Sequence, residues 1–245
     1  MLEASRKLMD YVEGSRAAVA FTGAGISTEC GIPDFRSKDS AWARHPPMPL
    51  GEFLASEHNR AEAWRRKFAM DDVYRGARPG KAHRAIARLV AENRMLGVVT
   101  QNIDGLHLAS GVPAEKIAEL HGNGGYAVCL SCERRHELDQ VRASFEATST
   151  APRCACGGIV KSATVSFGQS MPAAAMALAR SLVQRCDLMI VAGSSLVVFP
   201  AAGFPLLAVR NGARLAIVNR EPTPLDDAAD LVLRGDIGEI FGPLA

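Results

Sequence analysis

The chain has 245 residues, enough for one large domain and a smaller insertion around a sizeable core. Apolar residues make up 48% and charged residues 22%, which excludes a disordered protein, and a net charge of +2 indicates no nucleic-acid or membrane partner. No stretch is long and apolar enough for a membrane span, and residues 1–11 lack the apolar core of a signal region. We therefore expect a cytoplasmic protein whose six cysteines are metal ligands or core residues rather than disulfides.

Helical spacing alternates along the chain with short apolar runs that end at glycine or polar residues. The first helix is predicted over residues 2–12, with Leu2, Leu8, Met9 and Val12 on one face. Strands are predicted over 17–22, 96–100, 117–120, 188–192, 215–218 and 231–233. Further helices are predicted over 83–93 and 173–186, with Pro172 as the first residue of the second. This alternation predicts an α/β fold, a Rossmann-like doubly wound parallel sheet with helices on both faces.

Two stretches interrupt the alternation. Residues 37–83 are rich in Trp, Pro and charge, and we interpret them as loops and short helices. Residues 122–158 contain four of the cysteines. We expect both to form a small inserted domain, packed by Trp42 and Trp64. The large domain would then consist of residues 1–36, 84–121 and 159–245.

Ligands of such sheets bind beyond the carboxyl ends of the strands. Polar or glycine residues follow most of the predicted strands, and they should lie along that one edge: Thr22, Gly23, Gln101, Asn102, His121, Gly193, Ser194, Ser195, Asn219 and Asp236. Their convergence predicts a ligand site more strongly than any single motif does.

The segment Gly23-Ala24-Gly25 follows the first predicted strand. Glycines there would let the backbone approach a pyrophosphate, and a following helix would add a positive dipole end, although a structural turn explains the loop as well. The third glycine of the usual dinucleotide fingerprint is missing, and no acidic residue follows about 20 residues later to bind the ribose. Both departures argue against a dehydrogenase. Asn219 and Glu221, after a later strand, are alternative ribose ligands.

The cysteines of the second interruption form two close pairs. Cys129 and Cys132 make a Cys-x-x-Cys motif, and Cys154 and Cys156 are followed by two glycines that permit a tight turn. The alternative is four unrelated thiols. The pairing favours a tetrahedral zinc site, and because four thiolates fill the coordination sphere, one zinc per chain would be structural.

The sequence offers one histidine at the predicted ligand edge. His121 ends a strand, where an imidazole could accept a proton near neutral pH. A lone histidine is more often structural, and the other five have no comparable placement: His45, His58, His83, His107 and His136. Neither a Gly-x-Ser-x-Gly elbow nor a Walker loop is present, which argues against common hydrolases and nucleoside triphosphatases.

Taken together, these motifs resemble the sirtuin family of NAD-dependent protein deacylases, of bacterial type. The similar strings occur in the family's order: Gly23-Ala-Gly-Ile-Ser27, Gly31-Ile-Pro-Asp-Phe-Arg36, Thr100-Gln-Asn-Ile-Asp104-Gly-Leu-His107, His121-Gly122, the four cysteines, Phe167-Gly168, Gly193-Ser-Ser-Leu196 and Asn219-Arg-Glu221. The resemblance implies that residues 37–83 include a helical cofactor loop and that residues 122–158 are a zinc module. NAD, as co-substrate, and an acyl-lysine protein or peptide would enter the cleft between the two domains.

The resemblance also implies roles for particular residues. His121 would be the base, Asn102 would act in the nicotinamide pocket, and Phe35 would shield the reactive sugar carbon. The dinucleotide would contact Gly23, Ala24, Gly25, Ile32, Asp34, Phe35, Arg36, Gln101, Asn102, Ile103, Asp104, Gly193, Ser194, Ser195, Asn219, Glu221 and Ile237. The peptide would pair as a strand with Val165, Ser166, Phe167, Gly168 and Val197. The expected products are nicotinamide, an O-acyl-ADP-ribose and free lysine.

A few positions depart from the family pattern. Gln169 stands in place of a common glutamate, Ser194 in place of a frequent threonine, and the second cysteine pair is Cys-x-Cys. The Tyr-x-x-Arg pair of members that remove succinyl-type groups aligns with Lys67 and Met70, so we expect an uncharged acyl group, acetyl first, although basic residues nearby could attract an acid. Two alternatives remain, a protein mono-ADP-ribosyltransferase and a catalytically silent module that binds NAD or ADP-ribose.

Overall fold

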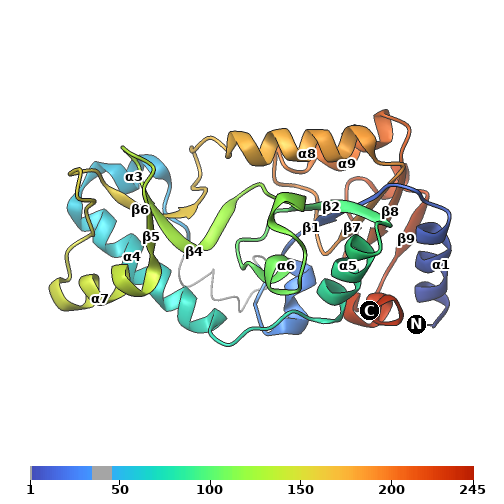
Figure 1. Ribbon diagram of the computed structural model, residues 1–245, viewed down its shortest axis with the longest axis horizontal. Helices are drawn as coiled ribbons and strands as arrows, with labels where there is room; N and C mark the ends of the chain where they lie inside the picture. Colours follow the sequence, from blue (N-terminus) through green and yellow to red (C-terminus); the bar gives the residue numbers. More distant parts are fainter. Residues whose placement is uncertain (1, 35–45) are drawn as a thin grey trace.

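A computed structural model describes residues 2–34 and 46–245 of the chain. Two lobes are visible in Figure 1, a larger one that contains both termini and a smaller one at the left. The large lobe is built on six parallel strands: β1 (Ala18–Thr22), β2 (Met95–Thr100), β3 (Ile117–Glu119), β7 (Leu188–Ala192), β8 (Arg214–Val218) and β9 (Leu231–Leu233). Their order is β3-β2-β1-β7-β8-β9, so the sheet winds outward in both directions from β1, and the predicted doubly wound α/β fold is confirmed.

The central strands are apolar because both faces of the sheet are covered. Every residue of β1 and β7 is buried. Ala18 and Ala20 of β1 face one core, which also includes residues of α1 (Leu2–Glu13), α5 (Lys81–Ala91) and α10 (Ile237–Phe241). Val19 and Phe21 face the other, beneath α8 (Ala173–Arg185) and α9 (Gly203–Arg210). Strands that are buried on both faces have continuous apolar runs, and those runs made the strands recognisable in the sequence.

The short helices lie in the connections. They are α6 (Leu106–Ala109) and the 3₁₀ helices η1 (Ala24–Cys30), η2 (Ala114–Lys116), η3 (Asp226–Ala228) and η4 (Gly242–Leu244). No helix within residues 2–34 and 46–245 has the length and apolar character needed to cross a membrane.

Within the described residues, the small lobe contains an antiparallel sheet and three helices. Its strands are β4 (Gly122–Cys129), β5 (Arg135–Glu137) and β6 (Val160–Thr164), in the order β5-β4-β6. The helices are α3 (Leu50–Ala55), α4 (Glu57–Tyr74) and α7 (Leu138–Thr148). Trp64 and Phe68 of α4 stack at 5.3 Å between ring centroids, and Phe68 meets Phe145 of α7 at 5.8 Å. The two stretches that interrupt the alternation therefore share one core, although the exact domain boundaries remain a prediction.

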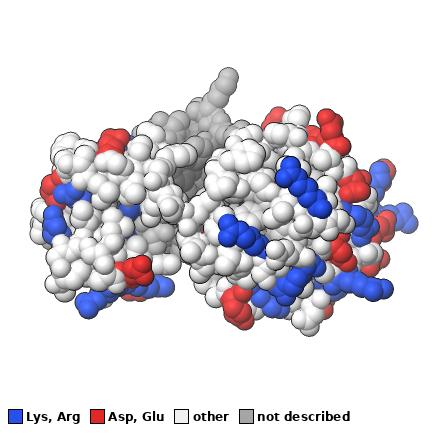
Figure 2. Space-filling model, turned by 90° about the horizontal axis from the view of Figure 1, so that it is seen from above, with Lys and Arg blue, Asp and Glu red and all other residues white. Residues whose placement is uncertain are grey.

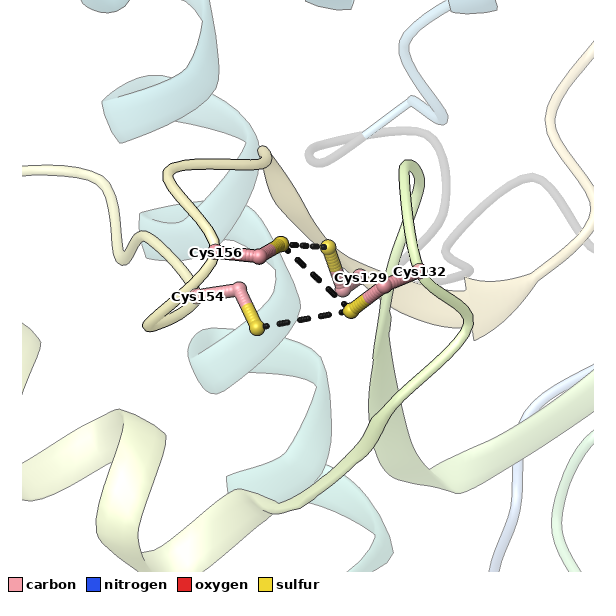
Figure 3. Close-up of side chains that lie close together, drawn as sticks. All are labelled: Cys129, Cys132, Cys154 and Cys156. Atoms are coloured by element: carbon pink, nitrogen blue, oxygen red, sulfur yellow. Dashed lines mark hydrogen bonds between the residues drawn. The ribbon is translucent and has the colours of Figure 1, made fainter.

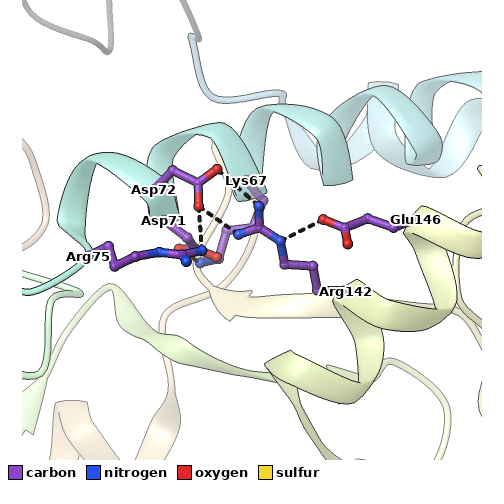
Figure 4. A network of polar contacts seen from close by, with 6 residues as sticks. All are labelled: Lys67, Asp71, Asp72, Arg75, Arg142 and Glu146. Carbon is purple, nitrogen blue, oxygen red and sulfur yellow. Dashed lines mark hydrogen bonds and ion pairs between the residues drawn. The ribbon is translucent and has the colours of Figure 1, made fainter.

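A polar network also joins α4 to α7 (Figure 4). Arg142 of α7 binds Asp72 of α4 through two N–H groups, at 2.8 and 3.0 Å, and Glu146 through a third at 2.7 Å. The same guanidinium lies over the ring of Phe68, 5.4 Å from its centroid. This contact fixes α4 to α7 within the small lobe.

Some details of the predicted elements are wrong. Leu2 is 85% exposed, because the first helix begins at the edge of the core and only Leu8 and Val12 of its proposed face are buried. Pro172 is the N-cap of α8, one position before the first helical turn. In the first interruption, where we expected short helices, α4 continues for 18 residues. Trp42 lies outside the described residues.

Candidate functional site

A cavity of about 1600 Å³ lies between the lobes. Its walls come from loops at the carboxyl ends of β1, β2, β7 and β8 and, on the other side, from α4 and β6. The strand order reverses between β1 and β7, and ligands of doubly wound sheets bind at such a point. In Figure 2 the charged side chains lie mainly toward the outer parts of the molecule, and the visible surface near the division between the lobes is largely uncharged.

The predicted site residues converge on this cavity. All the predicted dinucleotide and peptide residues within the described chain line it: Gly23, Ala24, Gly25, Ile32, Asp34, Gln101, Asn102, Ile103, Asp104, Val165, Ser166, Phe167, Gly168, Gly193, Ser194, Ser195, Val197, Asn219, Glu221 and Ile237. His121 lines it as well. Phe35 and Arg36 lie outside the described residues, and their roles stay predictions.

The glycine loop forms through contact with a second loop. The N–H of Gly25 donates to the carbonyl of Gly193 at 2.9 Å. A Cβ atom on Gly25 would lie 2.7 Å from the Cα of Gly193, and a Cβ on Gly23 would lie 2.7 Å from the Gly193 carbonyl oxygen. Gly193 itself has φ of +69°. Glycine is required here because the loops after β1 and β7 touch through their backbones.

Asn102 and Asp104 are held by one serine. The side-chain nitrogen of Asn102 donates to the carbonyl of Gly23 at 3.1 Å and to Ser27 Oγ at 3.2 Å. Ser27 Oγ in turn donates to Asp104 Oδ2 at 2.7 Å, and the N–H of Leu106 donates to Asp104 Oδ1 at 2.9 Å. The side-chain nitrogen of Asn102 is thereby committed, and its Oδ1 is the atom left to accept a hydrogen bond from a ligand.

The loops after β2 and β3 position His121. Its Nδ1 lies 3.0 Å from the carbonyl oxygen of Gln101. A carbonyl can only accept, so Nδ1 carries the proton and Nε2 keeps a free lone pair. Burial lowers the pKa of His121, and the hydrogen bond to Gln101 opposes this shift. The imidazole is therefore neutral near pH 7 and can act as a base.

The segment after β6 connects the lobes beside His121. The N–H of Val165 donates to the carbonyl of His121 at 2.8 Å, and the N–H of Leu50 donates to the carbonyl of Phe167 at 2.9 Å. Gln169, the departure noted in the sequence, accepts the N–H of Ser166 through Oε1 at 3.2 Å and so supports the turn. Phe167 is 59% exposed at this edge of the cavity.

Cations on α4 near the cavity already have carboxylate partners. Lys67 pairs with Asp71, and both side chains line the cavity. Burial is the largest influence on each group, lowering the pKa of Lys67 and raising that of Asp71. Arg65 and Arg66 both pair with Glu62. The charge of Lys67 is thereby paired at the cavity wall, whereas the two arginines share one carboxylate.

The four predicted zinc ligands form one cluster (Figure 3). Their sulfur atoms lie within 4.8 Å of one another, with Cys129–Cys156 at 3.5 Å and Cys132–Cys154 at 3.7 Å. Zinc–sulfur bonds of about 2.3 Å in a tetrahedron separate the sulfurs by about 3.8 Å, so this donor set fits one zinc ion. A Cβ on Gly158 would lie 2.5 Å from the sulfur of Cys129, which explains the glycine.

Sequence reasoning missed several polar residues of the site. Ser27 connects Asn102 to Asp104, a role that was not assigned to it although it stands in the family-like string Gly23-Ala-Gly-Ile-Ser27. His107, which had no predicted placement, is buried behind the cavity, where its Nε2 lies 2.9 Å from Oγ1 of Thr22. The position of His107 four residues after the loop of Asn102 and Ile103 was the available signal.

Fold and site together define a Rossmann-type protein whose dinucleotide-type cleft faces a lobe with a four-cysteine metal site. The model of the Sir2 family matches residues 23–200. An NAD-dependent protein deacetylase of Rhodopseudomonas palustris is 55% identical, over 97% of this chain and 94% of its own length. NAD-dependent protein deacetylase 1 of Bradyrhizobium diazoefficiens is 53% identical, over 97% of this chain and 93% of its own length. A solved Sir2 structure with a p53 peptide and NAD+ has a TM-score of 0.86 at 36% identity, over 98% of this chain and 96% of that one. The chain belongs to the Sir2 family, and the resemblance to sirtuins is confirmed.

Proposed function

We propose that the protein is an NAD-dependent protein lysine deacylase that removes acetyl groups and produces nicotinamide, O-acyl-ADP-ribose and free lysine. One observation carries the proposal. His121, with Nδ1 bound to the Gln101 carbonyl and Nε2 free, lines the same cavity as the glycine loop and Asn102. A base and a nicotinamide-type amide pocket within one cleft fit a reaction in which a sugar hydroxyl must lose a proton.

The cavity fits a dinucleotide on several counts. The glycines at 23, 25 and 193 let the backbones of two loops that line the cavity touch, and Asn219 and Glu221 line the same cavity after β8. About 1600 Å³ is large enough for a dinucleotide together with an acyl-lysine side chain, since single ligand pockets span roughly 300–1,000 Å³. When bound, NAD supplies an electrophilic sugar carbon and a nicotinamide leaving group.

Each polar group of the pocket has a task in this proposal. Asn102 would present Oδ1 to the nicotinamide amide, because its nitrogen is held by Gly23 and Ser27. Asp104, kept in place by Ser27, would add negative charge near the position where positive charge develops on the sugar. His121 would remove a proton from a ribose hydroxyl through Nε2.

The substrate would be an acyl-lysine protein or peptide bound in extended form. Residues 165–168 and Val197 line the cavity, and exposed Phe167 and Phe199 would contact the side chains beside the modified lysine. Backbone pairing reads little sequence, so the enzyme would accept many protein partners. The Lys67–Asp71 pair supports an uncharged acyl group, because neutralised charge gives no attraction to a carboxylate.

The cysteine cluster would hold one structural zinc ion. Four thiolates leave no open coordination position, so the metal would take no part in the chemistry. Zinc thiolates would fit a cytoplasmic location, where thiols are kept reduced.

One experiment tests the proposal against its alternatives. The protein is incubated with NAD and an acetyl-lysine peptide, and both nicotinamide and peptide mass are followed. We expect nicotinamide and a deacetylated peptide in equal amounts, both lost with His121→Ala. Labelled ADP-ribose on protein, with the acetyl group retained, would indicate an ADP-ribosyltransferase. NAD binding without nicotinamide release across several acyl groups would indicate a silent module.

A further inference from the structure

A chain of buried polar groups runs behind the cavity wall to Asn102. Thr22 and Thr100 end the neighbouring strands β1 and β2, where they are paired in register. The hydroxyl of Thr22 donates to Thr100 Oγ1 at 2.8 Å, and Thr100 Oγ1 also accepts the main-chain N–H of Asn102 at 3.0 Å. On the other side, His107 Nε2 lies 2.9 Å from Thr22 Oγ1. His107, which does not line the cavity, is thus connected to a residue that does.

The hydrogen bonds define which nitrogen of His107 carries the proton. Because the hydroxyl proton of Thr22 goes to Thr100, Thr22 Oγ1 can only accept from His107, so Nε2 carries a proton. Burial lowers the pKa of His107 well below its usual value, and the ring is therefore neutral with its other nitrogen, Nδ1, unprotonated. The donated bond orients Thr22 and, through it, the lone pair of Thr100 that holds Asn102.

A second buried histidine packs against this ring. His83, in the first turn of α5, lies 4.9 Å from His107 between ring centroids, and its Nδ1 accepts the N–H of Gly80 at 3.4 Å. His83 Nε2 and His107 Nδ1 are buried without a hydrogen-bond partner in the described part of the chain. A buried nitrogen without a hydrogen-bond partner reduces the stability of the folded protein, so the presence of these two histidines needs an explanation other than stability. A role in positioning the site provides one.

We propose that His107 is a positioning residue of the enzyme: through Thr22 and Thr100 it fixes the main chain of Asn102, and with it the nicotinamide side of the cavity. The inference rests on the proposed function, because it assigns a role within that reaction. The Asn102 side chain has two precise contacts, with Gly23 and Ser27, and a shift of its main chain would disturb both. Misplacement by about 1 Å can slow a reaction about 100-fold.

Matched variants separate this role from a structural one. His107→Leu removes the donor at similar size, and we expect kcat/KM for NAD to fall about 10- to 100-fold. His107→Gln keeps an N–H within reach of Thr22, and we expect at least a third of the activity to remain. The double variant His107→Leu/Thr22→Val should have about the same kcat/KM as the less active of the two single variants, because each substitution breaks the same chain of hydrogen bonds.

A control measures the effect of lost stability alone. Val98→Ala removes buried methyl groups from β2 without touching the chain of hydrogen bonds, so it should lower Tm and leave kcat/KM unchanged. If His107→Leu does not fold, Thr100→Val removes the acceptor of the Asn102 N–H at the other end, and the same loss is expected. Full activity of His107→Leu, or equal losses in His107→Leu and His107→Gln, would overturn the inference.

Hydrogen exchange gives a readout that does not depend on catalysis. In the protein without ligands, the Asn102 N–H should exchange at least about 10-fold faster in His107→Leu and Thr22→Val, but not in His107→Gln. Unchanged exchange in all three would show that the chain does not hold Asn102. A wild-type protein that releases no nicotinamide would instead overturn the proposed function, and exchange would still decide whether His107 positions Asn102.

Discussion

The surroundings of the single residue His121 determine the pH range in which its imidazole can accept a proton. Burial and the Gln101 carbonyl act in opposite directions on its pKa, with burial the larger, so the folded pKa lies below the ordinary value of about 6.5. A base must be neutral, and activity is therefore lost as the pH falls through this lowered pKa.

We accordingly expect kcat/KM for deacetylation to stay constant from pH 8 down to about 6.5 and to fall below it. The measurement is a pH profile of nicotinamide release under conditions where the protein remains folded. His58→Ala, at an exposed position of α4, should leave the profile unchanged. A half-maximal point at or above pH 7 would contradict the proposed role of His121.

The pairing of Lys67 with Asp71 gives a prediction about acyl preference. Asp71→Asn leaves Lys67 without its carboxylate partner at the cavity wall, where a succinyl carboxylate could replace it. We expect the ratio of desuccinylation to deacetylation to rise about 10-fold, measured with matched peptides. Asp72→Asn, which loses hydrogen bonds to Arg142 and Arg75 but leaves the Lys67–Asp71 pair in place, should not change the ratio. An unchanged ratio in folded Asp71→Asn would show that Lys67 does not contact the acyl group.

At the scale of elements, the contact between the loops after β1 and β7 should be sensitive to one methyl group. Gly25→Ala places a Cβ 2.7 Å from Gly193 Cα, which is backbone and cannot move aside cheaply. We expect the Kd for NAD to rise more than about 10-fold, measured by calorimetry. Gly51→Ala, in α3 with open space around it, should bind NAD normally and gain about 0.5–1 kcal/mol. Normal binding by Gly25→Ala would contradict this account of the loop.

The turns that carry the four clustered cysteines should depend on bound zinc for their stability. Cys132→Ser should reduce zinc below half an atom per chain and lower Tm, because bound metal stabilises only the folded lobe. Cys30→Ser, outside the cluster, should keep a full zinc atom. Metal analysis and thermal unfolding of both variants provide the measurement. Equal zinc in both would count against the cluster.

The elements show which features could be predicted from the sequence. β7 lies within the predicted bounds because a buried parallel strand is an unbroken apolar run, and β9, a partly buried edge strand, was recognised from the same kind of run. The site residues at strand ends could be predicted as well, because the topology of a parallel sheet places the carboxyl ends of its strands at one edge. Ser27 and His107 both stand in the family-like strings, but their roles could not be predicted, because these depend on hydrogen bonds to residues 75 and 85 positions away. The length of α4 was missed because its stabilising contacts come from the other interruption.

For the whole molecule, the buried histidines make stability depend on pH. Burial lowers the pKa of His83 and of His107 in the folded protein. Between the lowered folded value and about 6.5, the unfolded chain binds protons that the folded chain does not. This contribution to stability is therefore fully present above pH 6.5 and is lost as the pH falls through the folded values.

Denaturant unfolding at pH 7.5 and 5.5 tests this dependence. For each proton that only the unfolded chain binds, the free energy of unfolding decreases by up to about 1.4 kcal/mol more per pH unit as the pH falls. His83→Gln/His107→Gln should show a shallower dependence than the wild type, even if it is less stable at pH 7.5. An equal change in the free energy of unfolding between the two pH values, in the wild type and the double variant, would contradict the expectation that both rings are buried in neutral form.

The strand order has a consequence for synthesis of the protein. β1 leaves the ribosome long before one of its two neighbours, β7, which begins only at Leu188. At about 5–20 residues per second, the nascent chain carries an apolar strand without that neighbour for on the order of 10 s. Because the small lobe is encoded between them, it can be complete first. We therefore expect β1 to need protection during translation, so that the yield of folded protein depends on chaperone supply as well as on the stability of the finished fold.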